Sequence, residues 1–252
     1  MAPPSSSPVA VVTGGAGGIG APICIGLAAA GFKVVVGYNR SADAAQKLAR
    51  ELPGNGHCAL AAPVTNSNAL KQLAHDVQQQ YGRCDVLVNS AGTTRFVPHN
   101  DLDGLDDALI DEILNTNVRG SFAPLRALKS LLEQSTLKGG GVVINISSLA
   151  AVIAMGSNVM YCASKAAVDN MTKSLARALA PKIRVLSVSP GLVDTDFVKS
   201  LDQNWRDEQS SRTPLRRLAQ PEEIAAAVVA AVTQLTFSTG CIIAVDGGRP
   251  LA

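Results

Sequence analysis

The chain has 252 residues, of which 47% are hydrophobic and 17% are charged, and its formal net charge is +2 at pH 7. This length and apolar content suffice for one large α/β domain or two small ones with a sizeable core. The small net charge, with no basic cluster among aromatic residues, argues against nucleic acid or an anionic membrane as a partner.

Cysteine usage and the most apolar segments indicate the compartment. The five cysteines are scattered and odd in number, which predicts reduced thiols in a cytoplasmic protein. The three histidines have no metal-ligand spacing, so no metal site is predicted. The most apolar long segment, Ile224–Val232, is too short to span a bilayer. Residues 1–8 are rich in Pro and Ser and predict a flexible tail, followed by a single domain over residues 9–252.

The chain begins with a predicted strand, a glycine-rich turn and a helix. Val9–Val12 is an apolar run, and apolar residues then recur every four positions from Ile19 to Leu27, as on a helix packed against a sheet. Backbone N–H groups at such a helix N-terminus, together with the helix dipole, can hold a pyrophosphate, although a plain glycine-rich turn is the alternative. The residues predicted to hold it are Gly14, Gly18, Ile19 and Gly20.

The second predicted strand, Val34–Val36, runs into Gly37-Tyr38-Asn39-Arg40-Ser41, where no carboxylate is present to bind ribose hydroxyls. Arg40 can instead meet a 2′-phosphate, with Asn39 and Ser41 as neutral donors. The pattern predicts NADP in preference to NAD, with NAD still usable. The alternative is that Arg40 is a solvated loop residue.

Strands and helices continue to alternate along the chain. Further strands are predicted at Cys58–Ala62, Val86–Val88, Val142–Ile146, Ile183–Val188 and Ile242–Val245, with helices at Ala42–Leu52, Asn68–Tyr81, Leu105–Ser135, Ser164–Leu179 and from Pro221. This alternation predicts an α/β fold with a mainly parallel sheet covered on both faces. Residues 192–212 are either a mobile lid over an apolar pocket or a surface excursion.

A possible proton-transfer site lies in residues 148–165. If the segment around Tyr161 and Lys165 is helical, the two side chains lie one turn apart on one face. A nearby ammonium favours the phenolate, so Lys165 is expected to lower the pKa of Tyr161. Ser148 follows a predicted strand and can hydrogen-bond a carbonyl or alcohol oxygen. The alternative is a surface Tyr and Lys on an amphipathic helix. Asn117 is disfavoured in mid-helix and is either functional or simply solvated.

Seven motifs in chain order resemble those of the short-chain dehydrogenase/reductase family. They are Thr13-Gly14-x-x-x-Gly18-Ile19-Gly20, Asn89-x-Ala91-Gly92, Asn117-Val118-x-Gly120, Ser148, Tyr161-x-Ala163-Ser164-Lys165, Pro190-Gly191 and Val245-Asp246-Gly247-Gly248. The resemblance covers residues 9–249. It implies a Rossmann-type, doubly wound parallel sheet of seven strands, an NAD(P) cofactor, and hydride transfer at a carbonyl or secondary alcohol.

The resemblance also implies a role for each residue of the site. Tyr161 is implied to be the proton donor or acceptor, Lys165 also to hold the nicotinamide ribose, Ser148 to orient the substrate oxygen, and Asn117 to support a water relay to Lys165. The cofactor contacts it implies are, besides the glycine loop and residues 38–41, Val64, Asn89, Ala91, Gly92, Tyr161, Lys165, Pro190, Gly191, Val193 and Thr195. The resemblance further implies that the long helices and the C-terminal strand region pair between subunits, which gives a homotetramer.

The substrate class is less well defined. The C-terminal part, from Thr213, and the segment Ala91–Arg95 resemble the branch that contains bacterial 3-oxoacyl-carrier-protein reductases. Many sugar, polyol and steroid dehydrogenases share the same C-terminal part. We therefore expect an NADP-dependent reductase of ketones, with 3-oxoacyl thioesters as the leading substrates. The alternatives are a sugar, polyol or other alcohol dehydrogenase, and a non-catalytic nucleotide sensor. Pro63 departs from the family, which places an Asp there to face adenine.

Overall fold

A single seven-stranded sheet forms the centre of the computed structural model, which describes residues 7–251 apart from the side chain of Phe197. All six strand pairings are parallel, and the strand order is β3-β2-β1-β4-β5-β6-β7. The Rossmann-type fold predicted from the sequence is thus confirmed. Residues 1–6 of the predicted tail and Ala252 lie outside the described residues.

The strands lie close to their predicted positions. They are β1 (Val9–Thr13), β2 (Lys33–Tyr38), β3 (Cys58–Ala61), β4 (Val86–Asn89), β5 (Gly141–Ile146), β6 (Ile183–Pro190) and β7 (Ile242–Val245). The helices are α1 (Gly20–Ala29), α2 (Ala42–Glu51), α3 (Ser67–Tyr81), α4 (Asp107–Ile113), the π-helix η1 (Leu114–Arg119), α5 (Gly120–Leu132), α6 (Ala150–Ile153), α7 (Val159–Leu179), α8 (Asp196–Lys199), α9 (Gln203–Ser211), α10 (Pro221–Thr233) and the 3₁₀-helix η2 (Arg249–Leu251).

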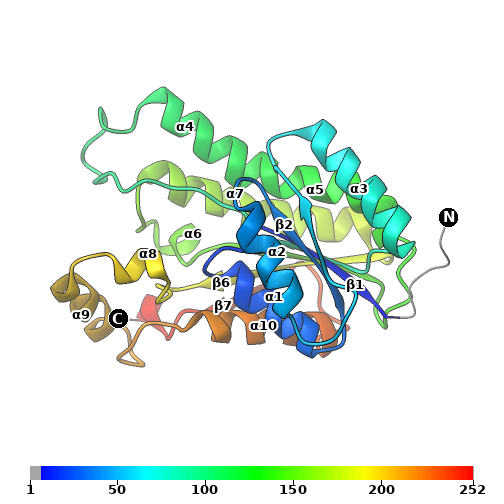
Figure 1. Ribbon diagram of the computed structural model, residues 1–252. Coiled ribbons are helices and arrows are strands. Elements are labelled where there is room, and N and C mark those ends of the chain that lie inside the picture. Colours follow the sequence, from blue (N-terminus) through cyan, green and yellow to red (C-terminus); the bar gives the residue numbers. More distant parts are fainter. Residues whose placement is uncertain (1–6, 252) are drawn as a thin grey trace.

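Both faces of the sheet are covered by helices, as Figure 1 shows. Alternate residues of β1 point to opposite faces, so Val12 joins a core with α1, α2 and α10, whereas Val11 joins a core with α3, α5 and α7. The central strands β1, β4, β5 and β6 are buried along their whole length. Continuous burial explains why these strands are unbroken apolar runs in the sequence.

The strand order reverses between β1 and β4, because β2 and β3 lie on one side of β1 and β5 to β7 lie beyond β4. In open parallel sheets, ligands bind at such a switch point, outside the carboxyl ends of the strands. Thr13 and Asn89 are register partners at these carboxyl ends. The topology therefore brings the glycine loop after β1 and the segment after β4 to one edge of the sheet.

Two segments differ from the prediction, and residues 192–212 gain detail that the sequence did not predict. The catalytic-motif helix α7 begins at Val159 and not at Ser164, because the side chain of Asn158 caps it by accepting a hydrogen bond from the Tyr161 N–H at 2.7 Å. The expected helix Leu105–Ser135 is three consecutive elements, with a π-helical turn at Leu114–Arg119 in the middle. Residues 192–212 contain two short helices, α8 and α9.

Candidate active site

The glycine loop between β1 and α1 forms a cradle that side chains would fill. A Cβ on Gly20 would lie 2.1 Å from the carbonyl oxygen of Gly14, and a Cβ on Gly14, whose φ is +64°, would lie 2.9 Å from the Cα of Ala91. Within residues 7–251 the N–H groups of Gly18 and Ile19 have no hydrogen-bond partner. Free N–H groups before a helix N-terminus suit a pyrophosphate, so the predicted loop fits a dinucleotide.

The segment after β2 lies beside this loop, since the N–H of Gly15 donates to the carbonyl of Gly37 at 2.9 Å. Tyr38 is half-buried, whereas Asn39, Arg40 and Ser41 are exposed. Arg40 makes no hydrogen bond or ion pair with any other described residue. Its guanidinium is therefore free to bind a ligand anion at the adenosine end of the site.

Residues that follow β3 and β6 also lie at the carboxyl edge of the sheet. Val64 is buried, and its Cγ2 would lie 2.7 Å from a Cβ on Gly120, so glycine is needed where η1 passes into α5. After β6, Pro190 and Gly191 lead to Val193 and to Thr195, whose side chain would lie 3.1 Å from a Cβ on Gly18. The chain after β6 thus reaches across to the glycine loop.

Lys165 is at the centre of the proposed catalytic group. It is 7% exposed, and its ammonium donates to the carbonyl oxygen of Ile146 at the end of β5, at 2.9 Å. A Cβ on Gly92 would lie 3.4 Å from Asn117 Oδ1 and 3.8 Å from Lys165 Nζ, so the two polar groups border the same small space. The structure therefore brings together Gly92, Asn117 and Lys165, which come from three separate sequence motifs.

Tyr161 lies one turn before Lys165 on α7, with the ammonium 5.7 Å from the centre of its ring. Burial raises the pKa of Tyr161 above its ordinary value, and a hydrogen bond with the Ser148 hydroxyl lowers it by a smaller amount. This direction is opposite to the one expected from the spacing with Lys165. Burial also lowers the pKa of Lys165, to about 8. At neutral pH Tyr161 is thus a protonated phenol that can donate a proton.

Asn117 is buried in the π-helical turn, and its side chain binds two segments, the one after β4 and helix α7. Its Oδ1 accepts from the N–H of Thr93 at 2.8 Å, and its Nδ2 donates to the carbonyl of Thr93 and to Ser164 Oγ, both at 3.0 Å. The predicted task for Asn117 therefore includes fixing the segment after β4 against α7. A side chain that is 1% exposed and makes three hydrogen bonds is not the solvated residue that the alternative required.

Asn89 lies at the end of β4 and is 2% exposed. Its Nδ2 donates to the Ser121 carbonyl and to Asn145 Oδ1, both at 2.8 Å, whereas its Oδ1 has no partner in the described residues. These bonds tie β4 to β5 and α5 beneath the site. Asn89 thus supports the loop that carries Ala91 and Gly92, whose position over Gly14 is fixed by close backbone contact.

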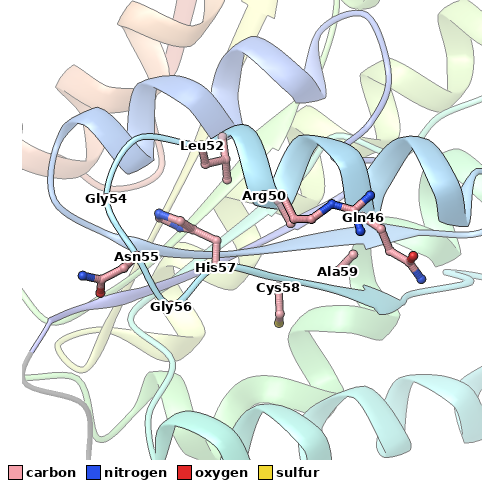
Figure 2. Close-up of a pocket in the computed structure, with 10 residues that line it drawn as sticks. Gln46, Arg50, Leu52, Gly54, Asn55, Gly56, His57, Cys58 and Ala59 are labelled. Carbon is pink, nitrogen blue, oxygen red and sulfur yellow. The ribbon is translucent and has the colours of Figure 1, made fainter.

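The cavity in Figure 2 is a different feature, a hollow of about 400 Å³ between α2 and the start of β3. Arg50 and His57 are among the side chains that line it, and none of the predicted site residues does. His57 holds this edge together: its Nδ1 accepts from the N–H of Val34 at 3.1 Å and its Nε2 bonds the Pro53 carbonyl at 3.0 Å. The hollow lies away from the proton-transfer group.

Sequence reasoning overlooked two residues that hold the proton-transfer group in place, Asn158 and Ser164. Asn158 is 1% exposed and Ser164 is fully buried. The signal for Asn158 is present in the sequence, because Asn three residues ahead of a helical Tyr is a typical N-cap. Ser164 belongs to the Tyr161 motif, but its partner Asn117 is far away in the sequence.

The glycine cradle at the switch point, next to a Tyr–Lys–Ser group that can move a proton, defines a nucleotide-dependent oxidoreductase. Comparison with known proteins agrees. A family model described as enoyl-(acyl carrier protein) reductase matches residues 14–249. The "Granaticin polyketide synthase putative ketoacyl reductase 2" of Streptomyces violaceoruber is 37% identical over 97% of both chains. The 3-oxoacyl-acyl-carrier-protein reductase FabG of Thermotoga maritima is 33% identical over 95% of this chain and 96% of its own.

Solved structures give the same result. A protein from Burkholderia xenovorans assigned to the short-chain dehydrogenases/reductases superposes with a TM-score of 0.91, at 35% identity, over 98% of this chain and all of its own. A short-chain dehydrogenase/reductase of the glucose/ribitol dehydrogenase type from Brucella melitensis gives 0.88 at 29% identity, over 99% of both chains. The chain belongs to the short-chain dehydrogenase/reductase family and is an oxidoreductase that acts on CH–OH or keto groups with a nicotinamide cofactor.

No helix within residues 7–251 combines the length and apolar character needed to cross a membrane. The same residues contain no group of three or more His, Cys, Asp or Glu side chains placed to hold a metal ion.

Proposed function

We propose that the protein is an NADPH-dependent reductase of ketones, with 3-oxoacyl thioesters as its substrate class. The observation that carries the proposal is the group formed by Ser148, Tyr161 and Lys165 at the carboxyl edge of the sheet, next to the glycine cradle. When bound, the nicotinamide cofactor supplies the hydride.

The protein's own residues handle the proton. The Tyr161 phenol, protonated at neutral pH because burial raises its pKa, donates its proton to the substrate oxygen. The Ser148 hydroxyl, which already bonds Tyr161, holds that oxygen. Lys165 is charged near neutral pH and lies between the Ile146 carbonyl and the space beside Gly92, where it holds the nicotinamide ribose. Asn117, which borders the same space, supports proton resupply to Lys165.

The preference for NADP rests on the residues after β2. Tyr38 occupies the position where a carboxylate would bind both ribose hydroxyls and repel a 2′-phosphate. Arg40 is exposed and free of partners within the described chain, so its planar fork is available to the phosphate. Gly17 supplies no second cation, so the preference is expected to be clear but not absolute.

The substrate class follows from the relatives and from the chemistry of the site. The Streptomyces violaceoruber relative is named as a ketoacyl reductase and the Thermotoga maritima relative as a 3-oxoacyl reductase. The segment Ala91–Arg95, next to Tyr161, carries the resemblance to that branch. A sugar or polyol dehydrogenase is the second candidate, because the Brucella melitensis structure bears that name.

A substrate panel tests the proposal. Initial rates are measured by nicotinamide absorbance with a 3-oxoacyl thioester, a simple cyclic ketone, a sugar alcohol and a secondary alcohol, each with both cofactors. We expect the highest kcat/KM for the 3-oxoacyl thioester with NADPH. Faster oxidation of the sugar alcohol than reduction of the thioester, at matched cofactor saturation, would replace this proposal with the second candidate.

A further inference from the structure

Hydrogen bonds form a closed ring around the first turn of α7, the turn that carries Tyr161. Asn117 Nδ2 donates to Ser164 Oγ at 3.0 Å, and Ser164 Oγ donates to the Tyr161 carbonyl at 2.7 Å. The Tyr161 N–H donates to Asn158 Oδ1 at 2.7 Å. The ring closes through the segment after β4, which Asn117 holds at Thr93.

Asn158 is the residue that connects α7 to this segment. Its Nδ2 donates to the Arg95 carbonyl at 2.8 Å and to Thr94 Oγ1 at 3.2 Å, on the side of the ring opposite Asn117. The backbone supports the same connection, since the Val97 N–H donates to the Ser157 carbonyl at 2.8 Å and the hydroxyls of Thr94 and Ser157 bond each other. One buried amide thus caps the helix and ties it to the segment.

An ordinary N-cap needs only the acceptor oxygen. Asn66 is such a cap: its Oδ1 accepts from the N–H groups of Asn68 and Ala69 at the start of α3, and it is largely solvent-exposed. Asn158 is only 1% exposed and uses both ends of its amide. The Nδ2 group of Asn158 does not contribute to helix capping. We infer that its bonds to Thr94 and Arg95 fix the position of the first turn of α7.

That position matters for proton transfer. A proton donor has to be held within hydrogen-bond reach of the substrate oxygen, and a displacement of about 1 Å can cost roughly a hundredfold in rate. Tyr161 is in the first turn of α7, where helices fray, and the capping bond of Asn158 is to its own N–H. The ring therefore acts directly on the backbone of Tyr161.

We propose that Asn158 is a positioning residue for Tyr161, acting by tying the first turn of α7 to the segment Thr94–Arg95. The inference rests on the proposed role of Tyr161 as proton donor. It predicts that loss of the tie slows proton transfer with little change in cofactor affinity, because the glycine loop and residues 38–41 of the cofactor site lie on other elements.

Two variants of Asn158 separate its two functions. Asn158→Ala removes both the cap and the tie, and should lower kcat roughly tenfold to a hundredfold while KM and cofactor affinity change by less than about threefold. Asn158→Ser restores a good helix cap but is too short to reach Thr94 and Arg95. We expect it to recover most of the melting temperature of the wild type and little of the kcat.

The solvent deuterium isotope effect on kcat gives a readout that a loss of stability does not change. It should be larger in Asn158→Ser than in the wild type, because proton donation from a less well placed Tyr161 becomes more rate-limiting. Thr94→Val leaves the helix cap intact and removes one of the two partners of Asn158 Nδ2. It should lower kcat, as the Asn158 variants do. This variant tests the tie even where Asn158→Ala does not fold.

Asn66→Ala is the matched control, because it removes an N-cap of the same residue type from α3. It should lower the melting temperature and leave kcat within about twofold of the wild type. Wild-type kcat in Asn158→Ser would show that Asn158 is only a cap and would overturn the proposal, as would unchanged kcat in both Asn158→Ala and Thr94→Val. The proposed function fails separately, if Tyr161→Phe retains full turnover.

Discussion

At the scale of single residues, burial decides the chemistry of Tyr161 and Lys165. Lys165 is buried and Tyr161 is half-buried at the start of α7, and burial disfavours their charged forms, which raises the pKa of the phenol and lowers that of the ammonium. Ser148 partly offsets this effect on Tyr161. The result is a neutral acid beside a cation that is close to its own titration, an arrangement suited to proton donation and rapid resupply.

Replacement of the phenol tests the donor. Tyr161→Phe keeps the ring and its packing but removes the proton, so we expect turnover to fall by roughly 10²–10⁴-fold with little change in cofactor affinity. Steady-state rates and fluorescence titration with NADPH measure the two quantities. Asn66→Ala, which changes a cap on the remote helix α3, serves as a control for handling and stability. Turnover near that of the wild type would refute the role of Tyr161.

The buried ammonium has a cost in stability that depends on pH. The pKa of Lys165 is about 8 in the folded protein, below the ordinary value of 10.5, so the penalty is fully present below pH 8 and is lost as the pH rises to 10.5. Below pH 8 it amounts to about 3 kcal/mol.

Lys165→Met removes that penalty together with the charge. Relative to the wild type, its free energy of unfolding should be higher at pH 7, and this advantage should shrink between pH 8 and 10.5. Urea denaturation of both proteins at several pH values measures the difference. A difference that does not change with pH would show that Lys165 titrates normally in the folded protein.

Cofactor choice is also decided by single side chains. Arg40 is exposed without a protein partner in the described chain, so Arg40→Ala should leave the fold intact and weaken NADPH binding roughly tenfold to a hundredfold. NADH binding should change little, because NADH has no 2′-phosphate. Dissociation constants for both cofactors decide the matter. Equal losses for the two cofactors, or tighter NADH binding by the wild type, would show that Arg40 does not bind the phosphate.

At the scale of elements, local patterns predicted what depends on neighbours in sequence. The strands are apolar runs, and the i, i+4 spacing of Tyr161 and Lys165 needs only a helix, so both could be predicted. The ring around α7 could not, because Asn158 reaches Thr94 across 64 residues and Asn117 reaches Ser164 across 47. The π-helical turn at Asn117 has no local sequence signal that distinguishes it from an α-helix.

Another long-range contact fixes α10 to the sheet. Arg184 at the start of β6 is 6% exposed, and its guanidinium donates to four carbonyls at and beyond the end of α10, those of Ala231, Val232, Leu235 and Ser238, at 3.0–3.3 Å. The carbonyls of Ala231 and Val232 are ones that a helix C-terminus leaves without intrahelical partners, and a cation is favoured there. The sequence shows Arg184 only as a charge within an apolar strand.

Loss of this contact should destabilise the protein without affecting the site. Arg184→Met leaves several buried carbonyls unpaired and is expected to cost about 2–4 kcal/mol of unfolding free energy. Arg184 lies at the opposite end of β6 from Pro190, so cofactor affinity of the folded protein should be unchanged. Denaturant unfolding and NADPH titration check the two statements. A decrease in unfolding free energy below about 0.5 kcal/mol would mean that water replaces the guanidinium as the hydrogen-bond donor to these carbonyls.

At the scale of the whole molecule, the exposed apolar side chains include some on α5 and some beside the edge strand β7. On α5, the Phe122 side chain is 38% exposed with the Arg126 guanidinium 5.8 Å from its ring centre. At one edge of the sheet, β7 is the outermost strand and is only half-buried. Phe237, which precedes β7 in the chain, is fully exposed. The family resemblance implied that the long helices and the C-terminal strand region pair between subunits.

We therefore predict a homotetramer of dihedral symmetry, in which α5 and α7 pair across one two-fold axis and the β7 edges meet across another. Light scattering at micromolar concentration should give four times the 26.0 kDa mass of one chain. Phe122→Glu places a charge on the first contact only, so it should give a dimer that still unfolds cooperatively. Ile25→Glu changes a residue of similar exposure, 47%, on α1, which belongs to neither contact, and should stay tetrameric. A wild-type mass of one chain would contradict the assembly, and a tetrameric Phe122→Glu would exclude α5 from the interface.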